Sequence, residues 1–166
     1  AFVVPTMLTR IIAAMEEAVG LYNGNGYFPK FLYANYNAGV PTAQAGYGGW
    51  MDFGNSFGTR VTLHEIAHTL GCGTHWNWPY KQSGGQWTGA ETIRYARLFD
   101  GPTAAIGCDA IHFWPYGLNY DNEDSATNRV RHVKIVAAMR RDMGIVGVNE
   151  NDGVFDDDQD GLPDDW

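Results

Sequence analysis

The sequence predicts an α+β fold, in which a small twisted sheet precedes a central helix and further helices follow it. Segments 30–36 and 46–53 are rich in aromatic residues and bounded by glycine or proline, which predicts two strands. Apolar residues recur at helical spacing in segments 5–22, 61–70 and 125–143. Thr88 followed by Glu91 is the pattern of a capping box and predicts another helix that ends near Phe99.

The central helix carries the motif His-Glu-x-x-His. His64 and His68 are four residues apart, so both imidazoles leave the same face of a helix and can bind one metal ion. Glu65 points beside that ion, where its carboxylate can take a proton from a water molecule. Gly71 allows a left-handed turn that ends the helix, and His75 then comes within reach as a third ligand.

The surroundings of the motif favour a metal site over a surface helix with chance histidines. The helix is mostly apolar, which predicts that it is central and buried. Two histidines and a glutamate inside a core need partners, because an unpaired buried polar group is costly. A zinc ion with three protein ligands keeps one position open for water and lowers the pKa of that water to about 7. We therefore expect a zinc-dependent hydrolase.

His-Glu-x-x-His-x-x-Gly followed by another histidine resembles the metzincin clan of zinc endopeptidases. In that clan the third histidine lies three residues after the glycine; here Thr74 stands there and His75 follows it. This spacing is nearer to that of the archaemetzincins, whose downstream cysteine pattern is absent. The likeness covers residues 59–143. It implies a zincin fold, with a central active-site helix and a C-terminal helical part, and the hydrolysis of internal peptide bonds.

A second segment resembles the Met-turn of the metzincins. It runs from Tyr116 to Tyr120, and Leu118 stands in the place of the methionine. Because leucine and methionine have similar volumes, an apolar floor below the metal is retained. Tyr120 matches the tyrosine that in astacin-like and serralysin-like metzincins binds zinc or stabilises the transition state. The resemblance also implies that strand 46–53 is the edge strand along which extended substrate binds.

The sequence leaves the third zinc ligand open between two histidines. His75 is one residue out of register, and His112 immediately precedes the turn-like segment. The alternative for His112 is a hydrogen-bonded residue within an aromatic cluster. A further histidine, His132, lies among basic residues of the last helix and is expected at the surface.

The charge divides the chain into residues 1–148, the expected metallopeptidase domain, and residues 149–166. The first segment has 11 acidic and 11 basic side chains, so the net charge of −8 comes from the second. Four aspartates of the second segment have the spacing of a calcium loop and resemble a thrombospondin type 3 repeat. These candidate calcium ligands are Asp156, Asp158, Asp160 and Asp164. The alternative is that this segment is an acidic linker that binds no calcium. Position 12 of a calcium loop would be residue 167, so we expect the full-length protein to continue beyond Trp166.

The two cysteines and the composition bear on where the protein works. Cys72 and Cys108 flank the two motif regions, so they either form a disulfide or are separate buried thiols. No apolar run is long enough to span a membrane, and no basic patch predicts nucleic acid as a partner. No leader pattern opens the chain, so we expect that an export signal has been removed.

The leading hypothesis is a secreted zinc endopeptidase, a monomer within a larger multidomain chain. His64, His68 and His75 would hold zinc, Glu65 would be the general base, and Tyr120 would stabilise the oxyanion. The partners would be protein or peptide substrates, with Ca²⁺ as a second candidate cofactor. One alternative is a catalytically weakened, metzincin-like binding module for polysaccharide or a cell surface. Another is a zinc hydrolase that acts on a different amide or ester.

Overall fold

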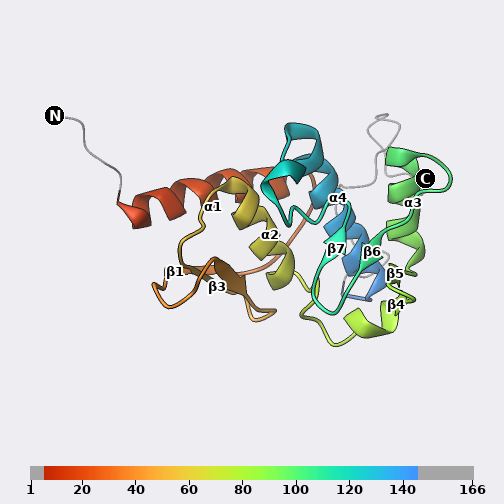
Figure 1. The fold of residues 1–166 in the computed structure, drawn as a ribbon, viewed down its shortest axis with the longest axis horizontal. Helices are drawn as coiled ribbons and strands as arrows, with labels where there is room; N and C mark the ends of the chain where they lie inside the picture. The colour runs from red at the N-terminus through yellow and green to blue at the C-terminus, as the bar shows by residue number, and fades with distance from the viewer. Residues whose placement is uncertain (1–5, 146–166) are drawn as a thin grey trace.

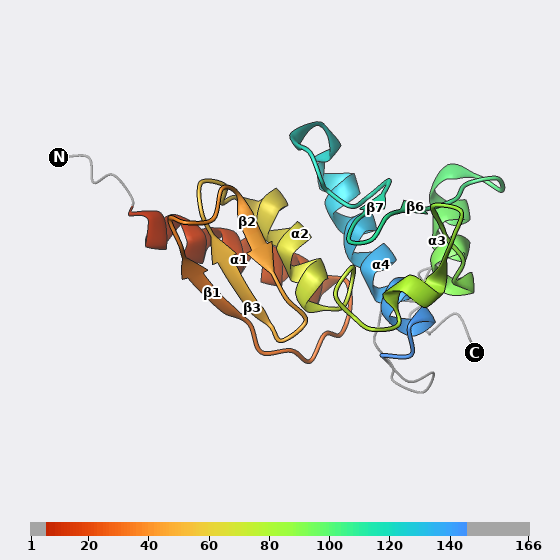
Figure 2. The same ribbon diagram turned by 60° about the horizontal axis from the view of Figure 1, so that its bottom comes forward.

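The computed structural model describes residues 6–145, and its N-terminal part is a three-stranded sheet backed by two helices (Figures 1 and 2). The elements are α1 (Met7–Gly24), β1 (Tyr33–Tyr36), β2 (Ala43–Ala45), β3 (Trp50–Phe53) and α2 (Thr59–Thr69). The strand order is β1-β3-β2, with β1 parallel and β2 antiparallel to β3. Helices α1 and α2 pack against each other and against the strands.

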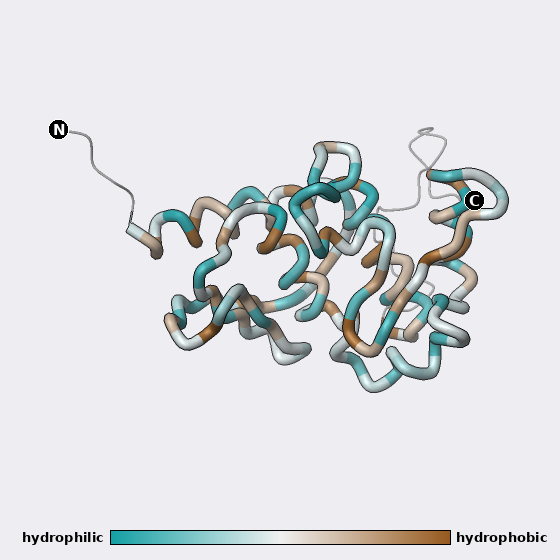
Figure 3. The backbone as a smooth tube through the Cα atoms, viewed as in Figure 1, coloured by the Kyte–Doolittle hydropathy of each residue, from teal (hydrophilic) through white to brown (hydrophobic). Residues whose placement is uncertain are grey.

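Helix α1 confirms the predicted helix over 5–22. The Thr6 side chain accepts a hydrogen bond from the backbone N–H of Thr9 at 3.2 Å, which caps the first turn. One face of the helix is buried, and it comprises Ile11, Ala14, Ala18 and Tyr22. Hydrophobic and hydrophilic segments alternate along the chain in Figure 3, as expected for elements with one buried side.

The sheet corrects one expectation that bears on the site. Segment 46–53 was expected to be the edge strand, but β3 lies between the other two strands. The two edge strands are β1 and β2, and the one that borders the cavity is β2. With three residues, β2 is too short to show a period in the sequence. Met51 and Phe53 are fully buried, which is why β3 takes the central place.

Helix α2 begins without a side-chain cap. Its N-cap residue is Gly58, and no neighbouring side chain makes a capping hydrogen bond. The Thr59 hydroxyl is instead bonded to the carboxylate of Glu17. At the other end Gly71 has a φ of 117°, which confirms the left-handed turn.

The C-terminal part of the described residues has two α-helices and two 3-10 helices beside a sheet of four two-residue strands. It contains η1 (Trp78–Lys81), β4 (Gln82–Ser83), β5 (Gln86–Trp87), α3 (Ala90–Asp100), β6 (Gly107–Cys108), β7 (Phe113–Trp114), η2 (Asp121–Glu123) and α4 (Ala126–Asp142). The strands are antiparallel in the order β4-β5-β6-β7, and α3 packs on α4. The architecture is mixed α+β, as predicted.

Helix α3 is capped from a distance rather than by its own sequence. No side chain at its N-cap, Gly89, makes a capping bond, so the predicted capping box at Thr88 is wrong. The carboxylate of Asp142 does the capping from the end of α4, by accepting the N–H groups of Glu91 at 3.0 Å and Thr92 at 3.1 Å. The last turn of α4 is thereby joined to the first turn of α3.

His132 is the clearest error of the sequence-based prediction. It was expected at the surface, but its side chain is fully buried on α4. Its ring lies in a stacked arrangement on Phe113 with the centroids 5.9 Å apart.

No helix within residues 6–145 is long and apolar enough to cross a membrane.

Candidate metal centre

Two histidines of α2 turn their Nε2 atoms toward each other. These atoms of His64 and His68 are 3.1 Å apart. The Nδ1 of His64 lies 2.8 Å from the carbonyl oxygen of Gly117, and that of His68 lies 2.7 Å from the carbonyl oxygen of Cys72. Because a carbonyl can only accept, each Nδ1 carries the ring proton and each Nε2 carries a lone pair. Two lone pairs therefore face each other across a short gap.

This arrangement fits a shared cation. Two imidazole nitrogens at about 2.0–2.1 Å from a tetrahedral zinc ion are about 3.3 Å apart. Burial lowers the pKa of His64 to about 3, and it also lowers the pKa of His68, so neither ring takes up a proton near neutral pH to relieve the contact. Carbonyl acceptors on the far nitrogen are the usual device that orients metal-binding histidines.

His112 is the third member of the group. Its ring centroid lies 5.5 Å from that of His64 and 5.7 Å from that of His68. Each of the three rings offers a nitrogen atom, and these atoms all lie within 4.8 Å of one another. In the described part of the chain, the three histidines therefore form a group that could hold a metal ion. Of the two histidines between which the sequence left the third ligand open, the fold brings His112 to His64 and His68.

The turn between β6 and β7 carries His112 to this place. The Oδ1 atom of Asp109 accepts the backbone N–H groups of Ile111 at 2.8 Å and His112 at 2.6 Å, which fixes the turn. A Cβ at Gly73 would lie 2.0 Å from the carbonyl oxygen of Ile111, so only glycine lets this turn approach the end of α2 so closely. The second glycine after the motif was therefore a signal that the sequence reasoning missed.

His75 is held elsewhere. Its ring centroid is 3.8 Å from that of Trp76 and 5.0 Å from that of Tyr47. Its Nδ1 accepts the backbone N–H of Asn77 at 3.2 Å. These contacts bury His75 in an aromatic cluster, and it is not part of the histidine group. The extra residue before it in the motif is consistent with this displacement.

Glu65 has an unpaired carboxylate oxygen beside the histidines. The residue is only 5% exposed, and its Oε2 atom has no hydrogen-bond partner in the structure. Burial raises the pKa of Glu65 to about 7, and the nearby Arg60 guanidinium opposes this effect. A carboxylate with such a pKa is matched to exchanging a proton with water at neutral pH.

The histidines and Glu65 open into a cavity of about 790 Å³. One wall is the edge strand β2 with its small side chains, Ala43 and Ala45. The opposite wall includes exposed apolar and aromatic side chains, namely Ile111, Trp114 and Tyr120. A cavity of this size holds several residues of a ligand rather than a single small ion.

The segment that resembles a Met-turn lies below the motif helix. Leu118 is fully buried with a φ of 55°, and the carbonyl of Gly117 is the acceptor for His64. A Cβ at Gly117 would lie 2.0 Å from the carbonyl oxygen of Phe113, so the turn needs glycine there. Tyr120 lines the cavity and is 70% exposed, which leaves its hydroxyl free to reach a ligand.

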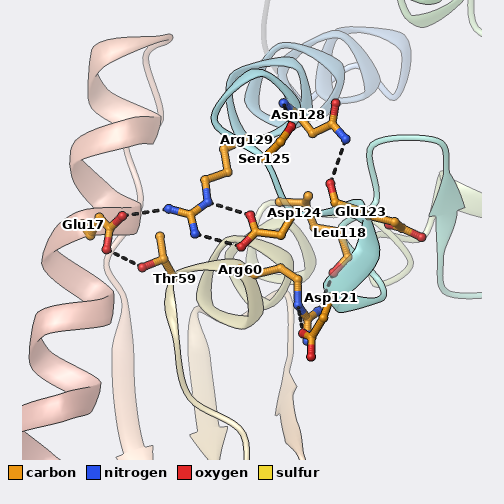
Figure 4. A network of polar contacts seen from close by, with 10 residues as sticks. All are labelled: Glu17, Thr59, Arg60, Leu118, Asp121, Glu123, Asp124, Ser125, Asn128 and Arg129. Carbon is orange, nitrogen blue, oxygen red and sulfur yellow. Dashed lines mark hydrogen bonds and ion pairs between the residues drawn. The ribbon is translucent and has the colours of Figure 1, made fainter.

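Arg60 ties this turn to α2, as Figure 4 shows. Its Nη1 donates to the carbonyl of Leu118 at 2.7 Å, and its Nε pairs with Asp121 at 2.7 Å. Next to it Arg129 pairs with both carboxylate oxygens of Asp124 and with Glu17 of α1 (Figure 4). The turn and the segment after it are thereby tied to α2, α4 and α1.

The two cysteines are free and buried, so the alternative of separate thiols holds and the expected disulfide is not formed. The Sγ of Cys72 lies 3.9 Å from the Sδ of Met139. Burial raises the pKa of Cys72 to about 12 and that of Cys108 to about 11, so both remain thiols at neutral pH.

The candidate calcium ligands of the tail lie outside the described residues.

Comparison with models of known families, with curated proteins and with solved structures gives no match. The case for a function therefore rests on the residues and their geometry.

Proposed function

We propose that the protein is a zinc-dependent endopeptidase of the metzincin type. The observation that supports this most is the pair of facing Nε2 atoms at 3.1 Å, with His112 as the third nitrogen and Glu65 lining the same cavity. Three imidazole nitrogens with a carboxylate beside them are the arrangement of a catalytic zinc site, in which the carboxylate is not a ligand. Zinc bound there would supply Lewis acidity and lower the pKa of a water molecule to about 7.

The protein's own groups would perform the proton transfers. Glu65 would accept a proton from the attacking water and return it to the leaving amine, which its pKa near 7 allows in both directions. Tyr120, exposed at the rim of the cavity, would donate a hydrogen bond to the oxyanion that develops on the scissile carbonyl. The carbonyls of Gly117 and Cys72 would hold the ligand rings in place throughout.

An extended peptide is the ligand that best suits the cavity. The edge strand β2 forms one wall, and an edge strand can pair its free backbone groups with an extended chain. The small side chains Ala43 and Ala45 leave room for such a chain to lie against the strand. Export and calcium binding by the tail stay predictions, since they depend on residues outside 6–145.

The test is the cleavage of casein by the purified chain. Wild type, wild type with a chelator, and Glu65→Ala are compared, and zinc content is measured in each. We expect hydrolysis only in the untreated wild type, while Glu65→Ala retains its zinc, because Glu65 transfers protons and does not bind the metal. Glu16→Ala, which removes an exposed acid on α1, is the matched control and keeps full activity.

Full activity of Glu65→Ala would contradict the mechanism. Wild type that binds zinc and cleaves neither casein nor a peptide library would contradict the peptidase. The result would then favour the binding module or a hydrolase for another amide or ester.

A further inference from the structure

A buried hydrogen-bond network lies behind the histidine group, at the junction of three helices. Its centre is His132 on α4, which is fully buried. The Nδ1 of His132 is 2.6 Å from the carbonyl oxygen of Tyr116, and its Nε2 is 2.9 Å from the hydroxyl of Tyr22 on α1. The same Tyr22 hydroxyl donates to the carbonyl oxygen of Leu63 on α2 at 3.1 Å, and this oxygen also lies 3.1 Å from His132 Nε2.

The two carbonyls in this network lie next to the hydrogen bond between His64 and Gly117 in the metal centre. Leu63 directly precedes His64, and Tyr116 directly precedes Gly117. The bond that orients the His64 ring runs from its Nδ1 to the Gly117 carbonyl. The network therefore holds both ends of that bond, one through α2 and one through the turn.

The chemistry of the network indicates more than packing. His132 has the fully buried Val133, Ile135 and Val136 as neighbours on α4 and Phe113 against its ring. An apolar side chain in this position would avoid the cost of burying a polar ring. A histidine stands here instead, with both nitrogens directed at atoms next to the metal site. This is the kind of local exception expected where function decides a residue.

We propose that His132 and Tyr22 are positioning residues of the metal centre. By fixing the Leu63 and Tyr116 carbonyls they hold the His64 Nε2 opposite that of His68, and they thereby set the metal affinity of the site. The inference rests on the metal centre of the proposed function, but not on the identity of the substrate. Neither residue touches the metal, and both act through backbone groups.

The experiment measures zinc affinity by competition with a chromogenic chelator, together with the absorption spectrum of the cobalt-substituted protein. His132→Leu removes the hydrogen bond to the Tyr116 carbonyl and the polar neighbour of the Tyr22 hydroxyl, and it is expected to weaken zinc binding about tenfold, the lower range for partners that orient a ligand. The same variant is expected to alter the cobalt spectrum, because the position of one ligand changes. His132→Asn keeps an N–H donor near Nδ1 and is expected to recover most of the affinity. Tyr22→Phe removes one hydroxyl and is expected to cause a smaller loss.

A matched control separates positioning from general stability. Thr92 is fully buried and donates to Asp142 at 2.7 Å, at the junction of α3 and α4. Thr92→Val removes that buried bond and is expected to lower the melting temperature while leaving zinc affinity and the cobalt spectrum unchanged. If His132→Leu does not fold, Tyr22→Phe carries the comparison.

The outcomes distinguish this inference from the proposed function. Wild-type zinc affinity and cobalt spectrum in folded His132→Leu or in Tyr22→Phe would overturn the inference, even if casein is cleaved. An equal loss of affinity in Thr92→Val would overturn it as well. Weaker zinc binding in the His132 and Tyr22 variants, with no cleavage of any peptide by wild type, would support the inference and overturn the peptidase. No zinc binding by wild type would overturn both.

Discussion

The ionised Glu65 carboxylate should destabilise the metal-free fold, and replacing it by glutamine should therefore stabilise the protein. Burial raises the pKa of Glu65 from its ordinary 4.5 to about 7, and no hydrogen bond compensates its Oε2 atom. Since one pKa unit corresponds to about 1.4 kcal/mol, the charge costs the folded protein about 3 kcal/mol once Glu65 is fully ionised. Glu65→Gln removes this charge and keeps the shape of the side chain.

The sign of the pH dependence follows from the two pKa values. Below pH 4.5 the carboxyl is protonated in both states, so no cost is present. Between pH 4.5 and about 7 the unfolded chain releases its proton while the folded protein keeps it, so the free energy of unfolding falls as the pH rises. Above about pH 7 the full cost is present, and this is where the two proteins differ most.

The assay is urea unfolding of both proteins in the presence of a chelator. We expect Glu65→Gln to exceed wild type by about 3 kcal/mol at about pH 8, and by under about 1 kcal/mol at about pH 5. Glu16→Gln is the control for the loss of one exposed carboxylate. An equal difference at the two pH values, or a less stable Glu65→Gln at high pH, would refute the reasoning.

Three further predictions concern the ligands, the helix cap and the turn. Zinc at about one hundred times its Kd should raise the free energy of unfolding by about 2.7 kcal/mol. Native mass spectrometry should find one zinc ion bound to the wild-type protein. The His112→Ala variant should lose this ion, and the His75→Ala variant should keep it. Asp142→Ala should lower the free energy of unfolding by about 3 kcal/mol in urea titrations, because it leaves buried donors at the start of α3 without an acceptor. Retention of wild-type stability would contradict that capping role. Leu118→Met should bind zinc as wild type does and change the free energy of unfolding by less than about 1.5 kcal/mol, since the volume is conserved; a larger loss would show that the turn does not tolerate methionine.

Local patterns were enough to predict the helices and the centre of the site. Of the four α-helices within residues 6–145, three were located by apolar periodicity, and α3 was located by a capping pattern that the fold does not use. The spacing of His64 and His68 predicted that both rings leave one face of the helix, because four residues on a helix return to the same face. Both residues line one cavity, together with Glu65. The very short strands were missed, since two or three residues carry no period.

The errors share a physical cause, which is that they depend on segments far apart in the sequence. His132 is followed and preceded by basic residues, which indicated a surface position, yet its partners come from α1, α2 and the turn after β7. The cap of α3 comes from Asp142, which lies on another helix. No window of sequence contains such pairs.

The sequence by itself determined that this protein has a helix with two histidines on one face and a glutamate beside them, and a glycine turn after it. It also determined that residues 1–148 are neutral and residues 149–166 acidic. Only the tertiary structure decided that His112 rather than His75 joins the pair, and that β2 rather than β3 borders the cavity. The physical reason is that helical spacing is set by local backbone geometry. The approach of a distant turn depends on close contacts such as that of Gly73 with Ile111, which form only when the chain is packed.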